Sequence, residues 1–250
     1  MSKINIKNRI GEEVKNRFGS KMILINWRKF EDIDVYFPQY NWIAYNMNYG
    51  NFKNGGIACP YEPRVFGAGY IGEGEMKMKK GYTQNDSYIA WKGIIERCYD
   101  EKCKRFGSTM SKEWLCFNCF NEWFKKNIYY VENQRMCVDK DILFKGNKHY
   151  SEKTCCIVPN DINVLFTNSR KTRGDLPLGV SKTQNGKFRA RCSVYNEEIL
   201  IGIYNTVEEA FLAYKFFKEN HIKEVADLYK DIIPYNLYNA MYNYKIEFDD

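Results

Sequence analysis

A ten-residue stretch in the middle of the chain, VDKDILFKGN at residues 138–147, brings carboxylates, an ammonium and an amide close together. Asp139 directly precedes Lys140, Asn147 follows in a loop, and Asn163 lies further along the chain. Carboxylate and amide oxygens are hard ligands that suit Mg²⁺. Histidine would suit the place of Lys140 better for activating water, because its reference pKa lies near neutrality. These residues raise the question of whether the site hydrolyses a bond.

Short apolar runs on both sides predict the elements that must position these residues. The expected order is a strand at about residues 135–138, a loop through Tyr150, a second strand at about residues 155–158, and a helix. Pro159 suits the first turn of that helix, since the N–H that it lacks needs no partner there. Asn163 is expected on the helix.

Two further helices are expected before this segment. Residues 86–101 are predicted to begin with Asp86 as cap, and residues 111–127 with Ser111 as cap. In the second, an aromatic residue recurs every three positions, and such a stripe is typical of a packed core rather than of a ligand site. These aromatic positions are Trp114, Phe117, Phe120 and Trp123.

The rest of the chain predicts a mixed α+β protein of three segments. Residues 1–75 are expected to be a β-rich accessory module, and the glycines of residues 65–75 a flexible link. Residues 76–174 hold the helices and the strand–loop–strand–helix segment. Residues 175–250 are expected to form a three-stranded antiparallel sheet, with turns at residues 185–187 and 196–198, backed by a long helix capped by Thr206.

Composition narrows the function classes. Hydrophobic residues make up 44% of the 250 residues and charged residues 28%, as in folded globular proteins. The formal net charge of +7 fits a polyanion partner. No apolar run approaches the ~18 residues of a membrane helix, and the first residues are too charged for a signal peptide. We therefore expect a cytoplasmic protein without a membrane partner, whose 9 cysteines form no disulfide framework.

A family resemblance rests on two groups of motifs. The first group is VDKD, GN and PNDIN, and the second runs from GV through NGKFRA to LIGIYNTVEEAFLAY. The chain resembles phage-encoded HNH-type (ββα-metal) homing-endonuclease-like proteins with a C-terminal Apetala/ethylene-response-factor DNA-binding domain. The resemblance covers most of residues 88–229. It implies double-stranded DNA as partner, a bacterial host cell as location, and no small-molecule cofactor.

The resemblance also implies roles for the residues of the candidate site. Asp139 and Asn163 match the positions that bind a single Mg²⁺ or Mn²⁺, and Asn147 matches the asparagine that braces the loop. Such an ion steadies the leaving oxygen and the charge of the transition state. If this holds, the carboxylate of Asp139 and the amide of Asn163 converge on one cation.

Lys140 departs from the family, which has its catalytic histidine there. Lysine has a reference pKa of ~10.4, so it acts as a base only if burial or nearby cations lower that value. Asp139 and Asp141 would oppose this if they lie close. The ammonium could instead hold the scissile phosphate, and His149 is an alternative base unless it is simply solvent-exposed.

In the resembled reader domain, a three-stranded sheet enters the major groove while a helix backs it. Strand alternation gives the apolar residues Phe188, Ala190, Cys192 and Val194 one face and the polar residues the other. The expected DNA-binding residues are Ser181, Lys182, Thr183, Asn185, Lys187, Arg189, Arg191 and Ser193, with Arg170, Lys171 and Arg173 in the preceding linker. The alternative is an ordinary solvated face.

A structural zinc site is not expected. Cys116 and Cys119 form a C-x₂-C pair, and Cys155 and Cys156 follow later, which invites the comparison. However, the first pair is predicted to lie within a helix, and adjacent residues of a strand point to opposite faces.

Three functions remain open from sequence. The leading hypothesis is a sequence-selective, metal-dependent DNA endonuclease of the homing or nicking type. The alternative is a DNA-binding regulator or structural protein on a catalytically lapsed HNH-like core. A third possibility, a protein that blocks a host factor by direct contact, would show no binding to nucleic acid at low salt. The sequence leaves the oligomeric state and the DNA target open.

Overall fold

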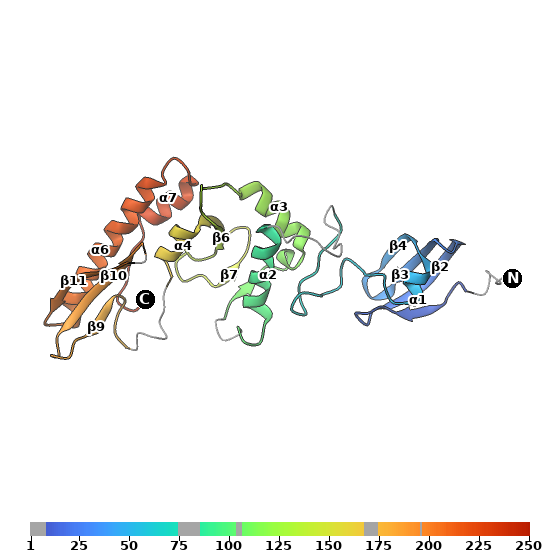
Figure 1. Ribbon diagram of the computed structural model, residues 1–250, viewed down its shortest axis with the longest axis horizontal. Helices are drawn as coiled ribbons and strands as arrows, with labels where there is room; N and C mark the ends of the chain where they lie inside the picture. Colours follow the sequence, from blue (N-terminus) through green and yellow to red (C-terminus); the bar gives the residue numbers. More distant parts are fainter. Residues whose placement is uncertain (1–8, 75–85, 104–106, 168–174, 196) are drawn as a thin grey trace. The chain divides into compact units, whose positions relative to one another are not determined.

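The computed structural model describes residues 9–74, 86–103, 107–167, 175–195 and 197–250. These residues form a mixed α+β protein with a four-stranded and a three-stranded antiparallel sheet, which confirms the expected class. The chain divides into two compact units, Met1–Lys126 and Asn127–Asp250 (Figure 1). Within the described ranges, no helix has both the length and the apolar character needed to cross a membrane.

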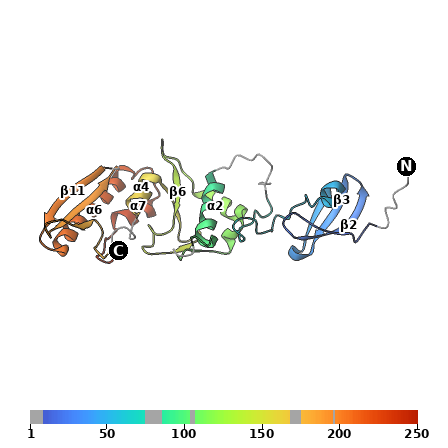
Figure 2. The same ribbon diagram turned by 60° about the horizontal axis from the view of Figure 1, so that its bottom comes forward.

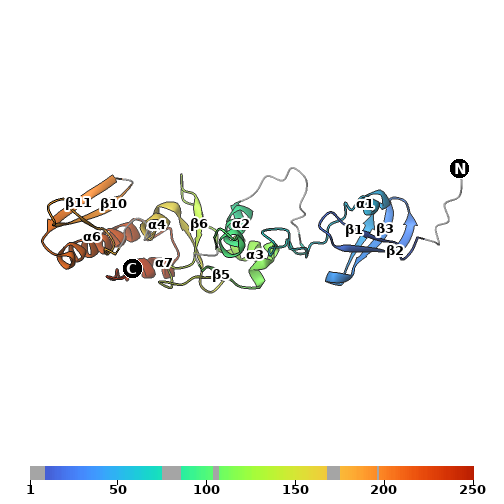
Figure 3. The same cartoon turned by 90° about the horizontal axis from the view of Figure 1, so that it is seen from below.

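The first unit begins with the four-stranded sheet, in the order β1-β2-β3-β4. Its core consists of apolar side chains such as Leu24, Val35 and Phe37, which are completely buried because alternate residues of each strand face inward. The short helix α1 (Tyr49–Lys53) follows, with Asn48 as cap (Figure 3). The strands are β1 (Glu13–Lys15), β2 (Lys21–Lys29), β3 (Asp32–Phe37) and β4 (Trp42–Met47).

The glycine-rich segment before residue 75 is packed over its described part, so the expectation of a flexible link is wrong there. Tyr70 forms a β-bridge with Cys116. A Cβ on Gly69 would stand 2.9 Å from the ring of Trp91, so a glycine is needed for this close approach. The glycines therefore allow this segment to pack against the helical part of the first unit, and they do not form a flexible link there.

The helical part of the first unit holds α2 (Asp86–Tyr99), β5 (Thr109–Met110) and α3 (Phe117–Asn127). The prediction of one helix over residues 111–127 is wrong, because a 3-10 turn at Glu113–Leu115 ends at Cys116, whose backbone is extended. The prediction that the aromatic stripe is core is confirmed, since Trp114, Phe117, Phe120 and Trp123 are buried.

The second unit starts with the expected strand–loop–strand–helix segment. Strand β6 (Met136–Asp139) pairs antiparallel with β8 (Cys156–Pro159), and Asp139 stands opposite Cys156. In the sequence, the short strand β7 (His149–Tyr150) comes between these two paired strands. Helix α4 (Asn160–Leu165) begins directly after Pro159, which is its N-cap.

The three-stranded sheet follows, in the order β11-β10-β9. Its strands are β9 (Val180–Lys182), β10 (Phe188–Val194) and β11 (Glu197–Tyr204). Glu197 and Glu198 already belong to β11, so the second turn lies earlier than expected. Helix α6 (Val207–Leu228) runs along one face of the sheet, and α7 (Tyr235–Tyr242) follows it (Figure 3). The predicted cap is confirmed, because Thr206 and Glu209 form a reciprocal capping box.

Helix α6 contributes to two hydrophobic clusters of the second unit. Ala210, Phe211 and Tyr214 near its start pack with the inner face of the sheet. Ile222 and Val225 further along pack with residues of β8, α4 and α7. Figure 2 shows the helices α4, α6 and α7 of this unit. One helix thus supports both the strand–loop–strand–helix segment and the sheet, and it joins the two within one unit.

The division at Lys126 differs from the three expected segments, since it falls inside residues 76–174. Packing explains the difference. Trp91 and Phe117 of the two helices contact each other, and Trp91 also contacts Gly69 of the preceding segment. Strand β8 and helix α4 instead share a core with α6.

Candidate functional site

Asp139 ends β6 with its carboxylate fixed in place. Its Oδ1 accepts hydrogen bonds from the backbone N–H groups of Asp141 and Ile142, each at 2.8 Å. Burial, with a smaller effect from the neighbouring carboxylate of Asp141, raises the pKa of Asp139 to about 6. A cation beside this carboxylate would favour its ionised form.

The side chain of Lys140 forms an ion pair with Asp141. Its Nζ lies 3.0 Å from Oδ2 of Asp141, and its side chain is only 17% exposed. The Nζ also lies 5.7 Å from the centre of the Tyr150 ring. The ammonium thus contacts a carboxylate and the face of an aromatic ring. In this geometry Lys140 is suited to bind a phosphate rather than to accept a proton from water.

Asn147 ties the loop together through its side chain. Its Nδ2 donates to the backbone carbonyls of Lys140, at 2.7 Å, and His149, at 2.8 Å. Its Oδ1 accepts from the backbone N–H of His149 at 3.1 Å. The amide thereby links the residue that follows Asp139 to the start of β7.

Asn163 lies on α4, which packs against both β6 and β8. Its side chain is half-buried and makes no hydrogen bond with any residue that the structure describes. The amide oxygen is therefore available to a ligand. That it meets the carboxylate of Asp139 at a common cation stays a prediction.

The donor set fits a hard cation better than a soft one. In the described ranges, no three His, Cys, Asp or Glu side chains form a group that could hold a metal ion. The carboxylate of Asp141 contributes to the raised pKa of Asp139, and the amide of Asn163 would add a neutral oxygen. Asp141 was not assigned as a ligand from sequence, although its D-x-D spacing from Asp139 was a signal that could have identified it.

The cysteines offer no comparable set. Cys116 donates to the backbone carbonyl of Ile71 at 3.7 Å, and Cys119 is exposed on α3. Cys155 and Cys156 are both buried, and burial raises the pKa of the Cys155 thiol to about 12. A protonated thiol binds zinc poorly, because the thiolate is the metal ligand.

The strand register places the predicted polar face of the sheet opposite the helix. Ala190 and Cys192 are buried against α6, with Phe188 and Val194 packed at the edge of the same cluster. On the other face the register forms cross-strand rows, with Arg189 between Ser181 and Ile203, Arg191 beside Leu200, and Ser193 beside Glu198.

The two arginines of this face have different surroundings. Arg191 is paired with the carboxylate of Glu198, which competes with any anionic partner. In the part of the chain that the structure describes, Nε of Arg189 and Oγ of Ser181 are buried atoms without a hydrogen-bond partner. These two side chains stand opposite each other on β10 and β9.

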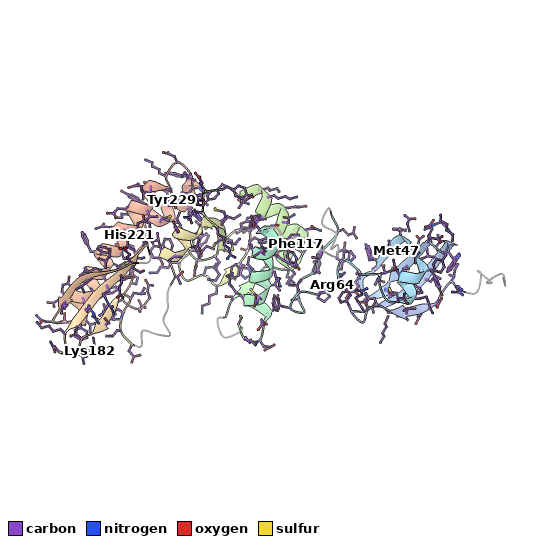
Figure 4. The ribbon with its side chains drawn as sticks, in the orientation of Figure 1. Met47, Arg64, Phe117, Lys182, His221 and Tyr229 are labelled. Carbon is purple, nitrogen blue, oxygen red and sulfur yellow. The ribbon has the colours of Figure 1, made fainter. Side chains whose placement is uncertain are left out.

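The hairpin between β9 and β10 carries the other predicted contact residues. Lys182, Asn185 and Lys187 are exposed, and Lys182 stands at the tip of the sheet (Figure 4). Thr183 is half-buried, and its Oγ1 donates to the carbonyl of Lys187 at 3.0 Å. The linker residues Arg170, Lys171 and Arg173 lie outside the described residues.

Comparison with known proteins adds no relative, since no family model, curated protein or solved structure matches the chain.

Proposed function

We propose that the protein is a sequence-selective DNA endonuclease of the nicking or homing type that depends on a single divalent metal ion. The observation that carries the proposal is the carboxylate of Asp139, held at the end of β6 by two backbone N–H groups. Burial is the main cause of its raised pKa, and perturbed pKa values of this kind cluster at functional sites. In the proposed layout, residues 1–75 are an accessory module, the segment from β6 to α4 is the catalytic core, and the three-stranded sheet reads DNA.

Each residue of the loop has a role in this proposal. Asp139 and Asn163 would hold Mg²⁺ or Mn²⁺, with Asp141 as a further carboxylate beside them. A bound ion of this kind supplies Lewis-acid stabilisation of the leaving oxygen. Lys140 would hold the scissile phosphate through its ammonium, and Asn147 would keep the loop in shape through its bonds to Lys140 and His149.

The sheet would select the cleavage site. A β-sheet fits the major groove, where arginine contacts guanine edges and apolar side chains contact thymine methyl groups. The outer face offers both kinds of group, because Arg189 and Arg191 stand beside the exposed side chains of Ile203 and Leu200.

The second candidate function is a DNA-binding regulator or structural protein on a lapsed nuclease core. The ion pair of Lys140 with Asp141 favours it, since it leaves the loop without a base at the histidine position. DNA binding through the sheet is common to both candidates.

A plasmid-nicking assay with Mg²⁺ or Mn²⁺ separates them, using wild type, Asp139→Ala, Lys140→Ala and Lys140→His. The endonuclease proposal expects nicking by wild type, its loss with Asp139→Ala, and a gain with Lys140→His. Loss with Asp139→Ala alone would place Lys140 outside the chemistry. Tight duplex binding without cleavage by any of the four proteins would establish the regulator instead.

A further inference from the structure

The second unit contains a cavity of about 760 Å³ that borders both the candidate catalytic loop and the sheet. One part of its lining comes from β10 and α6, including Ser193, Lys218 and His221. The other part comes from the loop after Asp139 and from α4, including Asp141 and Asn160. The cavity therefore touches both halves of the unit that we propose to act on DNA.

Lys218 is the notable charge in this lining. It is only 8% exposed, and its ammonium has no hydrogen bond or ion pair with any residue that the structure describes. Burial lowers the pKa of Lys218, which reflects the cost of keeping the charge there without a partner. A buried cation without an acceptor reduces stability, so its presence in a cavity indicates an anionic ligand.

The acidic side chains of the lining bond to groups other than Lys218. Lys145 bonds to Asp250 at 2.6 Å, and Asp141 bonds to Lys140 at 3.0 Å. Asp161 accepts from Gln134 at 2.6 Å. Gln134 is neutral, so Asp161 keeps its negative charge, but none of these bonds involves the ammonium of Lys218.

The groups around Lys218 suit a phosphate with an attached ring. His221 lies one turn along α6 and is 7% exposed, and its Nδ1 is 3.7 Å from a carboxylate oxygen of Glu224. Figure 4 shows His221 and Tyr229 at successive positions toward the end of α6. Phe166 and Tyr244, which also line the cavity, meet edge to face with ring centres 4.7 Å apart. Aromatic side chains are the usual stacking partners of nucleobases, and the volume is in the range of small-ligand sites.

We propose that this cavity binds a nucleotide, with Lys218 on its phosphate and the aromatic rings beside its base. Two sources offer this chemistry, namely a nucleotide of a DNA strand and a free nucleotide. Only the strand source rests on the proposed function, since the loop of Asp141 would lead the strand from the cleavage site into the cavity.

The test measures binding of thymidine 5′-monophosphate, thymidine, inorganic phosphate and a short single-stranded oligonucleotide to the full chain by calorimetry. Lys218→Met removes the charge and keeps the length of the side chain, and Lys218→Arg restores a cation. Lys223→Met is the matched control, since Lys223 lies on the same helix over the Tyr242 ring and does not line the cavity.

We expect wild type and Lys223→Met to bind thymidine 5′-monophosphate with equal affinity. Thymidine should bind to wild type at least tenfold more weakly. Lys218→Met should lower the affinity for thymidine 5′-monophosphate at least tenfold. Lys218→Arg should recover part of the loss. Thermal unfolding without ligand should show Lys218→Met to be at least as stable as wild type, which excludes misfolding as the cause.

Binding of the oligonucleotide but not of the free nucleotide would assign the cavity to the strand, and the reverse would assign it to a free nucleotide. The proposal is overturned if neither binds wild type, or if Lys218→Met leaves both affinities unchanged. Failure of the nicking assay with nucleotide binding intact would remove the endonuclease and leave the cavity site standing.

Discussion

The side-chain amide of Asn147 donates to the backbone carbonyl of Lys140 at 2.7 Å, across seven positions of the chain. The same amide makes two further bonds to the backbone of His149, so one side chain sets the shape of the loop after Asp139. The geometry of the candidate site therefore depends on a residue that needs no contact with substrate.

Replacement of Asn147 with Ala should lower stability by about 1–3 kcal/mol, because it removes three hydrogen bonds of the loop, including the one to the carbonyl of Lys140. Nicking should fall with it, since the loop no longer holds Lys140 in place. Chemical denaturation and the nicking assay measure the two effects. Lys148→Ala, at the next and exposed position, is the control. Equal stability of the two variants would contradict the bracing role.

Asp139 should make the stability of the protein depend on pH. Its folded pKa of about 6 lies above the ordinary value of 3.8, so its contribution is fully present below pH 3.8 and is lost as the pH rises through about 6. Asp139→Asn should remove this loss, and at pH 8 without metal it should stabilise the protein by at most about 3 kcal/mol.

Thermal unfolding of wild type and Asp139→Asn from pH 4 to pH 8 checks this sign. Mg²⁺ should stabilise wild type at pH 8 and have no such effect on the variant, because the asparagine cannot supply the carboxylate. If Asp139→Asn is less stable than wild type at every pH, burial of the charged Asp139 carboxylate does not destabilise the folded protein.

We expect Glu198 to lower the affinity of the protein for DNA. Its carboxylate pairs with Arg191 on the outer face of the sheet and would also repel phosphates. Glu198→Gln should tighten duplex binding several-fold and make log Kd steeper in log salt by up to about one unit, because Arg191 becomes free to replace a counterion. Glu132→Gln, an exposed site with the same change of charge, controls for net charge. An equal effect of both variants would remove Arg191 from the interface.

Leu200 and Ile203 should favour sites that contain thymine. Both are 55% exposed, and they stand beside Arg191 and Arg189 on the outer face. Replacing thymine by uracil in a selected duplex should weaken binding about fourfold for each methyl group contacted, or about 0.8 kcal/mol. The double variant Leu200→Ser with Ile203→Ser should bind the two duplexes alike. If wild type already binds them alike, the side chains do not reach the methyl groups.

Gly179 should tolerate no side chain. Its φ is +72°, and a Cβ would stand 2.0 Å from the ring of Tyr214 in the core between the sheet and α6. Gly179→Ala should therefore cost more than the roughly 1–3 kcal/mol of an ordinary strained position, and it should disturb β9 first. Gly186→Ala is the comparison, because Gly186 also has a positive φ but nothing lies within 4 Å of its Cβ position. Denaturant unfolding of both variants gives the difference.

The sequence by itself determined the local elements of this protein. The β-prone runs of β2 and β3, the alternation in β10 and the capping sequence at Thr206 are recorded in short stretches of residues, and the structure has these elements. The buried aromatic stripe of Trp114 to Trp123 was predictable for the same reason, since the period of apolar residues indicates which side packs.

Only the tertiary structure decided which of these elements pack together. The bridge from Tyr70 to Cys116 lies where the sequence predicts one continuous helix over residues 111–127. The same bridge holds part of the glycine-rich segment that the sequence predicts to be a flexible link. The shared helix α6 and the burial of Lys218 depend on contacts between distant residues. Burial and charge pairing arise from three-dimensional neighbours, and the spacing of residues along the chain does not record them.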